Sequence, residues 1–254
     1  MSTVSTIPTP LAHAVAGLRA EGLVKTVGKR VILNNVSLTV RRGEVVALLG
    51  PNGAGKTSCF QSIVGLTPLT SGTVMLDGVD VTHAPMYQRA RAGLGYLPQE
   101  ASIFRGLTVE QNIKGVLEMV ARTPAELHQR LDELLGEFGL TKLRHSPAPA
   151  LSGGERRRLE IARALATNPA YMMLDEPFAG VDPLAVREVK DLVFQLKNRG
   201  MGVLITDHNV RETLGLVDRA TIMFEGRVLA SGTPAEITQN SDVKRVYLGE
   251  DFKL

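Results

Sequence analysis

The clearest chemistry in the chain lies in one short segment that follows an apolar run and precedes a predicted helix. It reads Gly50-Pro51-Asn52-Gly53-Ala54-Gly55-Lys56-Thr57 and matches G-x-x-x-x-G-K-[ST] in the strand–turn–helix context that this motif requires. Glycines let backbone N–H groups converge on phosphate oxygens, and the new helix adds the positive end of its dipole. Lys56 would place a charge at the β- and γ-phosphates, Thr57 would ligate Mg²⁺, and Ser58 completes the predicted phosphate site. The alternative is a Gly-rich structural turn with a chance lysine.

Two adjacent carboxylates form the second candidate group. The apolar segment Tyr171–Leu174 ends at Asp175, and Glu176 follows directly. A carboxylate at the end of a buried strand is typical of a Mg²⁺ site beside a phosphate-binding turn. We therefore predict that Asp175 holds Mg²⁺ and that Glu176 is the general base that polarises the attacking water. Taken alone, paired acids at a strand end are also typical of a helix cap or a solvated turn.

A second anion-binding helix end is predicted in the middle of the chain, at Leu151-Ser152-Gly153-Gly154-Glu155. Ser152 is expected to cap the helix and Glu155 to complete a capping box. The two glycines expose backbone N–H groups at the positive end of the helix. On capping alone, an ordinary well-capped structural helix is the favoured interpretation of the segment.

The surrounding elements predict an α/β fold. Apolar strands at Glu44–Leu49, Tyr171–Leu174, Gly202–Thr206 and Ala220–Phe224 alternate with helices, which indicates a parallel sheet covered on both faces. Earlier strands flank the turn signal Asp77-Gly78. Capping boxes at Thr108 and Thr123 begin helices within residues ~100–167, and Gly139 ends the second of these helices.

Composition sets limits on function without naming one. The chain has 254 residues, a net charge of +3 and one cysteine, Cys59, so no intrachain disulfide is possible. So small a net charge does not indicate nucleic-acid binding by the chain as a whole, and Arg156–Arg158 are better explained as a solvated helix face or as interdomain contacts. No apolar run approaches the ~18 residues that cross a bilayer. Residues 1–16, with Pro8 and Pro10, are expected to be a flexible extension.

The order of these motifs, together with Gln99, Asp182 and His208, resembles the nucleotide-binding subunits of ABC transporters over residues ~18–254. The resemblance implies a P-loop NTPase with a RecA-like α/β core, an antiparallel β subdomain and a helical signature subdomain at about 100–167, together forming an ABC ATPase domain over residues 17–254. It also implies a head-to-tail homodimer. Each ATP, with Mg²⁺, would lie between one subunit's phosphate-binding turn and the other subunit's Ser152–Glu155.

The same resemblance assigns three further roles. Gln99 matches the Q-loop glutamine, which senses Mg²⁺ or water and links the core to the helical insert. Asp182 matches the D-loop, and by sequence alone it is the cap of a helix that continues with Pro183. His208 matches the switch histidine that contacts the γ-phosphate. An ordinary structural role is the alternative for each of these residues.

A narrower resemblance is carried by Tyr96–Arg105, Phe178–Pro183, Thr206–Thr213 and Val243–Phe252, which look like the ATPases of lipopolysaccharide export transporters. It implies a motor that is peripheral on the cytoplasmic face of the inner membrane and binds integral membrane subunits in a groove near Phe104 and Arg105. Branched-chain amino-acid import ATPases share parts of the pattern and are expected to be less similar at the C-terminus.

Two other classes of nucleotide-binding protein fit the sequence less well than a transporter subunit does. Soluble ABC ATPases that act on nucleic acid normally insert long coiled coils or zinc modules, and this sequence shows neither. A GTPase or small-molecule kinase would leave the Ser152–Glu155 motif unexplained, and the chain has no N-K-x-D guanine motif.

One position departs from the family pattern. An aromatic residue usually precedes the first strands and stacks on adenine, whereas the matching position here is Val27. A valine offers no π-face, so we expect weaker adenine stacking and predict that an aromatic residue at this position tightens ATP binding.

Overall fold

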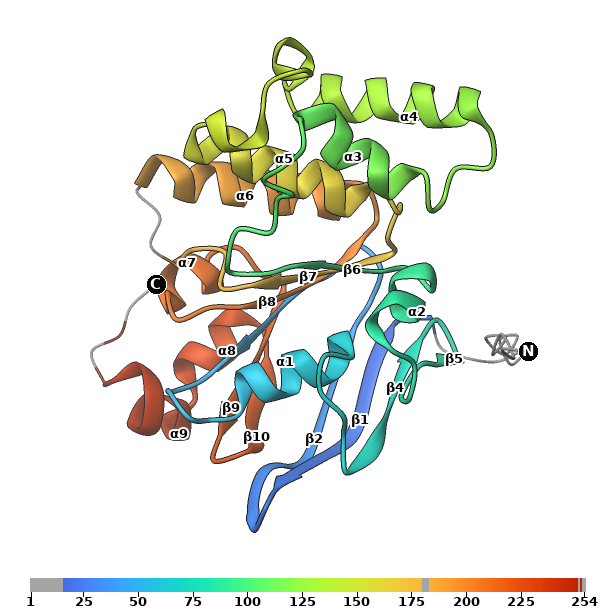
Figure 1. Ribbon diagram of the computed structural model, residues 1–254. Coiled ribbons are helices and arrows are strands. Elements are labelled where there is room, and N and C mark those ends of the chain that lie inside the picture. Colours follow the sequence, from blue (N-terminus) through green and yellow to red (C-terminus); the bar gives the residue numbers. More distant parts are fainter. Residues whose placement is uncertain (1–15, 180–182, 251, 253–254) are drawn as a thin grey trace, which may run out of the picture. The chain divides into compact units, whose positions relative to one another are not determined.

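In a computed structural model of the protein, residues 16–179, 183–250 and 252 are described, and the chain divides into two compact units. The first consists of residues up to 94 and from 170 onward, and the second of residues 95–169. The predicted extension falls almost wholly on residues 1–15, and Asp182 also lies outside the described residues. Figure 1 labels the elements of both units.

The first unit contains two β-sheets. An antiparallel sheet has the order β2-β1-β4-β5, and within this unit a second sheet has the order β10-β9-β3-β8-β7. In the second sheet, β3 runs parallel to β8 and β9, and β7 runs parallel to β8. The bounds of the strands are β1 (Leu18–Val27), β2 (Arg30–Val40), β3 (Val45–Leu49), β4 (Ser71–Leu76), β5 (Val79–Asp80), β6 (Leu94–Leu97), β7 (Tyr171–Asp175), β8 (Gly202–Thr206), β9 (Arg219–Phe224) and β10 (Arg227–Gly232).

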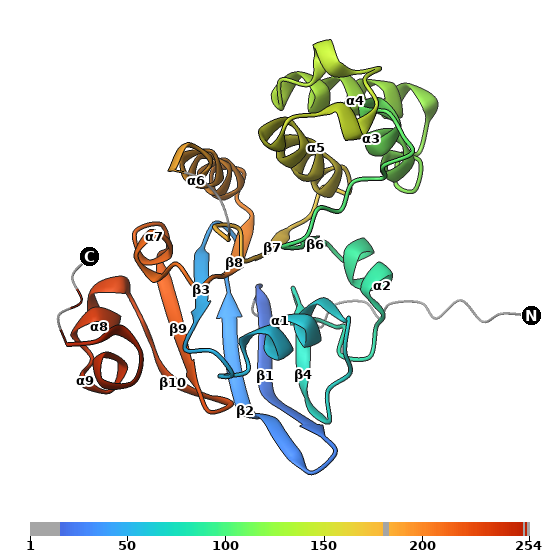
Figure 2. The ribbon, with the colours of Figure 1, turned by 60° about the vertical axis from the view of Figure 1, so that its left-hand side comes forward.

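The predicted parallel sheet and α/β fold class are confirmed. Every residue of β3 and β8 is buried, as expected for strands that are covered on both faces. Helix α1 (Lys56–Val64) contacts β8 as well as β1 and β2, so it lies between the two sheets. Helix α6 (Pro183–Asn198) packs against β8 and α7 (Val210–Leu214) against β3, on the face away from α1 (Figure 2). The remaining helices of this unit are α2 (Met86–Arg91), α8 (Pro234–Gln239), α9 (Ser241–Val243) and a π-helix (Lys244–Leu248).

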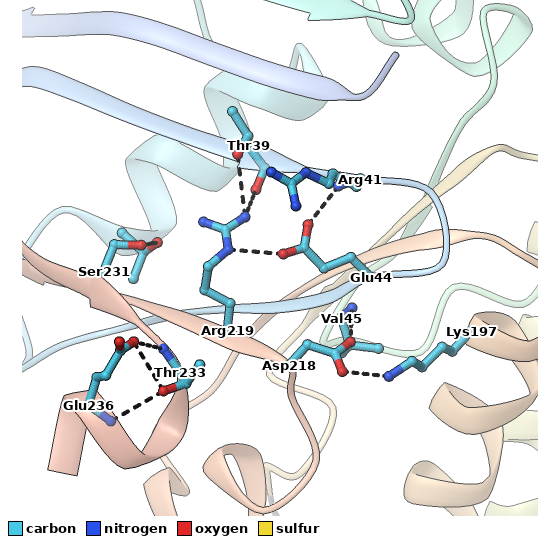
Figure 3. Close-up of polar contacts among 11 residues, drawn as sticks. Thr39, Arg41, Glu44, Val45, Lys197, Asp218, Arg219, Ser231, Thr233 and Glu236 are labelled. Carbon is cyan, nitrogen blue, oxygen red and sulfur yellow. Dashed lines mark hydrogen bonds and ion pairs between the residues drawn. The ribbon is translucent and has the colours of Figure 1, made fainter. Parts of the chain in front are cut away.

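Polar side chains fix the beginning of the central strand β3 (Figure 3). The carboxylate of Glu44 accepts from the Arg41 backbone N–H at 2.8 Å and from Arg219 Nε at 2.9 Å. Asp218 accepts from the Val45 backbone N–H at 2.9 Å and pairs with Lys197 at 2.5 Å. These contacts lie at the amino end of β3, whereas the Gly50 turn follows the carboxyl end of the strand.

The second unit is mainly helical. Its elements are α3 (Val109–Leu117), α4 (Pro124–Glu137), α5 (Gly153–Leu165) and two short 3₁₀ turns (Thr141–Leu143 and Ala148–Ala150). Apolar side chains from all three α-helices are fully buried and form its core, namely Val109, Ile113, Leu131, Leu134, Leu135 and Leu159. Among the described residues of either unit, no helix has the length and apolar character needed to cross a bilayer.

The predicted helix ends are mostly confirmed, with one correction. Both reciprocal hydrogen bonds of a capping box are present at Thr108 and at Ser152. At Thr123, the side chain accepts from the Glu126 N–H as predicted, but the Glu126 carboxylate accepts from the Arg122 N–H at 2.8 Å instead of the Thr123 N–H. The predicted capping box at Thr123 is therefore wrong in its second half, because the carboxylate bonds one residue further back.

Candidate functional site

The turn after β3 has a backbone that only glycine can supply at its key positions. Gly50, Gly53 and Gly55 have φ angles of +144°, +80° and +99°. A Cβ on Gly50 would lie 2.1 Å from the Met223 carbonyl oxygen, so a side chain there would displace strand β9. Nothing lies within 4 Å of a Cβ built on Gly53, which leaves that part of the turn open. The turn is thus rigid where it touches the sheet and free where a ligand would approach.

Lys56 places a positive charge over this turn. Its Nζ donates to the carbonyl oxygens of Gly50 at 2.7 Å and Pro51 at 3.0 Å. Burial lowers the pKa of Lys56 below its ordinary value, and the charge of Glu176 partly opposes this shift. A partly buried ammonium group that donates to carbonyl groups favours an anion beside it.

The beginning of α1 provides a second favourable feature for an anion. Its N-cap, Gly55, has no side chain to satisfy the first backbone N–H groups, and the first turn has no acidic residue. By contrast, α3, α5 and α8 all have a capping side chain and a glutamate at this position. The uncapped N–H groups and the helix dipole therefore suit the phosphate oxygens of a nucleotide.

The predicted acidic residues lie at the carboxyl ends of β7 and β8. Asp175 pairs with Thr206 across these strands, and its Oδ1 accepts from the Thr206 hydroxyl at 2.7 Å. Glu176 follows with a φ of +44°, and its N–H donates to the Thr206 carbonyl at 2.8 Å. The Oε2 atom of Glu176 lies 3.5 Å from Nδ1 of His208. Three residues that were predicted separately from the sequence are thus brought together: Asp175, Glu176 and His208.

The second unit places the remaining candidates on its own elements. Ser152 caps α5, where its Oγ accepts from the Glu155 N–H at 3.3 Å and donates to the Glu155 carboxylate at 2.8 Å. Hydrogen bonds from the backbone and side chain of Ser152 lower the pKa of Glu155. Gly153 has open space where a side chain would be, and Gln99 is exposed.

Phe104 and Arg105, the expected contacts for membrane subunits, are also exposed. The Arg163 guanidinium carbon lies 4.7 Å from the centroid of the Phe104 ring, so α5 holds this aromatic side chain at the surface. In the first unit, Val27 is 59% exposed at the end of β1. Val27 is therefore open to solvent, as a base-stacking position requires.

Two residues that contact or flank the acidic pair Asp175 and Glu176 were not predicted from the sequence. Thr206 contacts Asp175 and Glu176 as described above, and Asp207 is fully buried between the loops that follow β7 and β8. The only available signal was a polar Thr-Asp pair between an apolar strand and His208. Its importance depends on contacts with residues about thirty positions earlier, which no local pattern encodes.

This combination of sheet order, glycine turn and acidic strand ends defines a P-loop ATPase of the ATP-binding cassette class. The profile of the ABC transporter family matches residues 33–179, more than half of the chain, and the chain belongs to that family. It is the ATP-binding motor subunit of a transporter that works with membrane partners, and it is an ATPase. A profile described as branched-chain amino acid ATP-binding cassette transporter matches residues 227–253. The C-terminus therefore resembles those transporters as well, and the lower similarity expected there stays a prediction.

Relatives with similar sequences extend over nearly the whole chain. An uncharacterized ABC transporter ATP-binding protein of Rhizobium meliloti (strain 1021) is 62% identical over 93% of this chain and 88% of its own length. The lipopolysaccharide export system ATP-binding protein LptB of Escherichia coli (strain K12) is 53% identical over 94% of this chain and 100% of its own length. A crystal structure of an ATP-binding cassette in its ADP conformation matches with a TM-score of 0.81 and 28% identity, covering 93% of this chain and all of that one. The predicted family and fold are confirmed.

Proposed function

We propose that this chain is the ATPase that powers lipopolysaccharide export from the inner membrane. The observation that carries the proposal is its 53% identity to an LptB protein along that protein's full length. The alignment covers the whole of that protein, so it spans the positions proposed to bind membrane subunits as well as those of the ATP site. The motor would act at the cytoplasmic face of the membrane, with Phe104 and Arg105 contacting its integral membrane partners.

The residues of the first unit supply the proposed chemistry of hydrolysis. The backbone N–H groups of the Gly50–Thr57 turn and the start of α1, including Ser58, would bind the phosphates, with Lys56 neutralising their charge. Thr57, Asp175 and Gln99 offer oxygen ligands of the kind Mg²⁺ prefers, and the ion would neutralise charge on the β- and γ-phosphates. Glu176 would accept a proton from the attacking water, and His208 would contact the γ-phosphate.

The ATP site would be complete only in a homodimer. In the proposed arrangement, Ser152, Gly153, Gly154 and Glu155 of a second copy close over the ATP that lies on the first copy's turn. The uncapped beginning of α1 and the open space at Gly153 support this proposal, since both leave room for a shared phosphate. Asp182 would contribute at the same interface.

Import of branched-chain amino acids is the second candidate function, and the C-terminal profile match favours it. The two functions can be separated by depleting this chain in its own cell. Lipopolysaccharide export predicts that newly made lipopolysaccharide accumulates in the inner membrane, whereas import predicts loss of labelled leucine uptake. Restoration by the wild-type chain but not by its Glu176→Gln variant would tie either phenotype to hydrolysis. Unchanged lipopolysaccharide transport after depletion would contradict the leading proposal.

A further inference from the structure

A buried carboxylate joins the two loops that carry the proposed catalytic residues. The side chain of Asp207 has no exposed surface. Its Oδ2 atom accepts from the Phe178 backbone N–H at 2.8 Å, and its Oδ1 atom accepts from the Asn209 backbone N–H at 2.7 Å. The first bond reaches the loop after β7, and the second closes the loop after β8. One rigid group therefore fixes both loops at once.

Each of these loops carries a reacting side chain close to the point that Asp207 holds. Glu176 lies two residues before Phe178, and His208 lies between Asp207 and Asn209. Nδ1 of His208 is 3.5 Å from Glu176 Oε2 and 3.8 Å from Asp207 Oδ1. A shift of either loop would change the distance between the Glu176 and His208 side chains.

Burying a carboxylate is costly unless its hydrogen bonds are satisfied, and both oxygens of Asp207 accept a backbone N–H. In the part of the chain that the structure describes, no lysine or arginine forms an ion pair with Asp207, so backbone N–H groups and the flanking His208 provide its contacts. The negative charge of Asp207 also acts on Tyr247, which lies in the π-helix near the C-terminus. Burial raises the pKa of Tyr247 to about 12, and the negative charge of Asp207 contributes to that rise.

We propose that Asp207 is a positioning residue that keeps the Glu176 and His208 side chains at the relative positions that hydrolysis requires. The proposal rests on the roles proposed above for those two residues. In this proposal Asp207 acts through those two residues and not directly on the substrate or the attacking water. Its two carboxylate oxygens act as a fixed spacer between backbone N–H groups that lie on separate loops.

The first test is the Asp207→Asn variant, which keeps the shape of the side chain but can present only one oxygen acceptor. Its NH₂ group would then face a backbone N–H, so one loop must move. Because small misplacements of reacting groups cost up to about 100-fold in rate, we expect kcat to fall ~10- to 100-fold. The KM for ATP should change less than about twofold, since the phosphate-binding turn is untouched.

Asp218→Asn is a matched control. Asp218 also accepts from a backbone N–H in the first unit, but it does so at the beginning of β3. This variant should lower thermal stability and leave kcat unchanged when rates are expressed per active molecule. If Asp207→Asn behaves in the same way, or turns over normally, the positioning role is overturned. Should Asp207→Asn fail to fold, Asp207→Glu keeps the charge and moves the acceptors by one methylene, and the same fall in kcat is expected.

A double-mutant cycle with His208→Ala separates positioning from a general loss of structure. If Asp207 acts partly through His208, the kcat effect of Asp207→Asn should shrink several-fold in the His208→Ala background. Equal effects in both backgrounds would overturn the link to His208 while leaving the proposed function intact. Normal turnover of His208→Ala alone would contradict the proposed role of His208 and, with it, positioning of that residue by Asp207.

Discussion

The conformation of Glu176 supports a chemical role for its side chain. Its φ of +44° lies in the left-handed region, which costs a non-glycine residue roughly 1 kcal/mol or more. Its N–H donates to Thr206 and its carbonyl accepts from Ala179, so the surrounding loops hold this conformation. Glycine would fit the backbone without strain but would remove the carboxylate that faces His208.

We therefore expect Glu176→Gln to abolish hydrolysis and to preserve ATP binding. The amide has the same shape but cannot accept the proton from water, so phosphate release should fall at least ~100-fold. The ATP dissociation constant should stay within about twofold, because the phosphate-binding turn is unchanged. Glu225→Gln is a matched control, since Glu225 also has a positive φ, +48°, but lies in the β9–β10 turn. Near-normal phosphate release by Glu176→Gln would show that another group is the base.

Val27→Tyr tests the departure at the expected adenine position. An aromatic ring there would add a stacking surface worth about 0.5–1.5 kcal/mol, so ATP should bind ~2- to 10-fold more tightly with little change in kcat. The change in ATP affinity is measured by equilibrium binding with Val27→Tyr placed in the Glu176→Gln variant, so that ATP is not hydrolysed. Val31→Tyr is the control, because Val31 is similarly exposed, at 53%, on the neighbouring strand. Unchanged or weaker binding by Val27→Tyr would place the adenine elsewhere.

At the scale of elements, one turn residue ties the two sheets of the first unit together. Asp77, in the β4–β5 turn, accepts from the Gly17 N–H at 2.9 Å, the Tyr171 hydroxyl at 2.5 Å and Arg42 at 2.6 Å. Tyr171 begins β7 and is 1% exposed. Burial acts to raise the pKa of Asp77, but the hydrogen bonds from Tyr171, Arg42 and Gly17 outweigh it and hold that pKa below its usual value.

Removing the Tyr171 hydroxyl should loosen this connection. Tyr171→Phe keeps the buried ring and loses one hydrogen bond to a charged group, which costs about 1.5–3 kcal/mol of unfolding free energy at neutral pH. A depressed carboxyl pKa stabilises the fold above the unfolded pKa, and this stabilisation is lost as the pH falls through the folded value. The difference between wild type and variant in urea unfolding should therefore shrink below about pH 4. A difference that does not change with pH would exclude the ionised Asp77 as the partner.

The elements that were predicted best from the sequence are determined by residues that are close together in the chain. The Gly50 turn, the Ser152 box and the short apolar strands each depend on residues within a few positions of one another. Strand β1 is less regular, because its ladder with β2 shifts register near Gly22, where the φ of +59° interrupts any simple alternation. The Glu126 carboxylate shows a similar limit, since two backbone N–H groups compete for it and only the fold decides between them.

Buried charges were the least predictable features. Arg89 is 3% exposed, and its guanidinium donates to the carbonyl oxygens of Ser62 and Ile63 at the end of α1 and of Thr82 and Ala84. Burial lowers its pKa to about 10. From the sequence, this residue is one of two arginines on a short helix, and its acceptors are backbone atoms that no side-chain pattern reveals. Asp207 was missed for the same reason.

At the scale of the whole molecule, the halves of the proposed ATP site lie on different units of the chain. The phosphate-binding turn belongs to the first unit, and the Ser152–Glu155 helix end belongs to the second. The proposed dimer brings together halves from two copies, so each ATP becomes part of an interface. Assembly should then depend on nucleotide, because without it two positively polarised helix ends would face each other.

We therefore expect Glu176→Gln to form dimers with ATP and Mg²⁺ and to remain monomeric with ADP or without nucleotide, as measured by sedimentation velocity. Adding Ser152→Asp should prevent the ATP-dependent dimer. Aspartate still caps α5, but its charge would oppose the phosphates of the partner's ATP. Thr233→Asp is a matched control, because Thr233 and Glu236 form the same capping box at α8. A Ser152→Asp chain that still dimerises with ATP would mean that this helix end does not face the nucleotide.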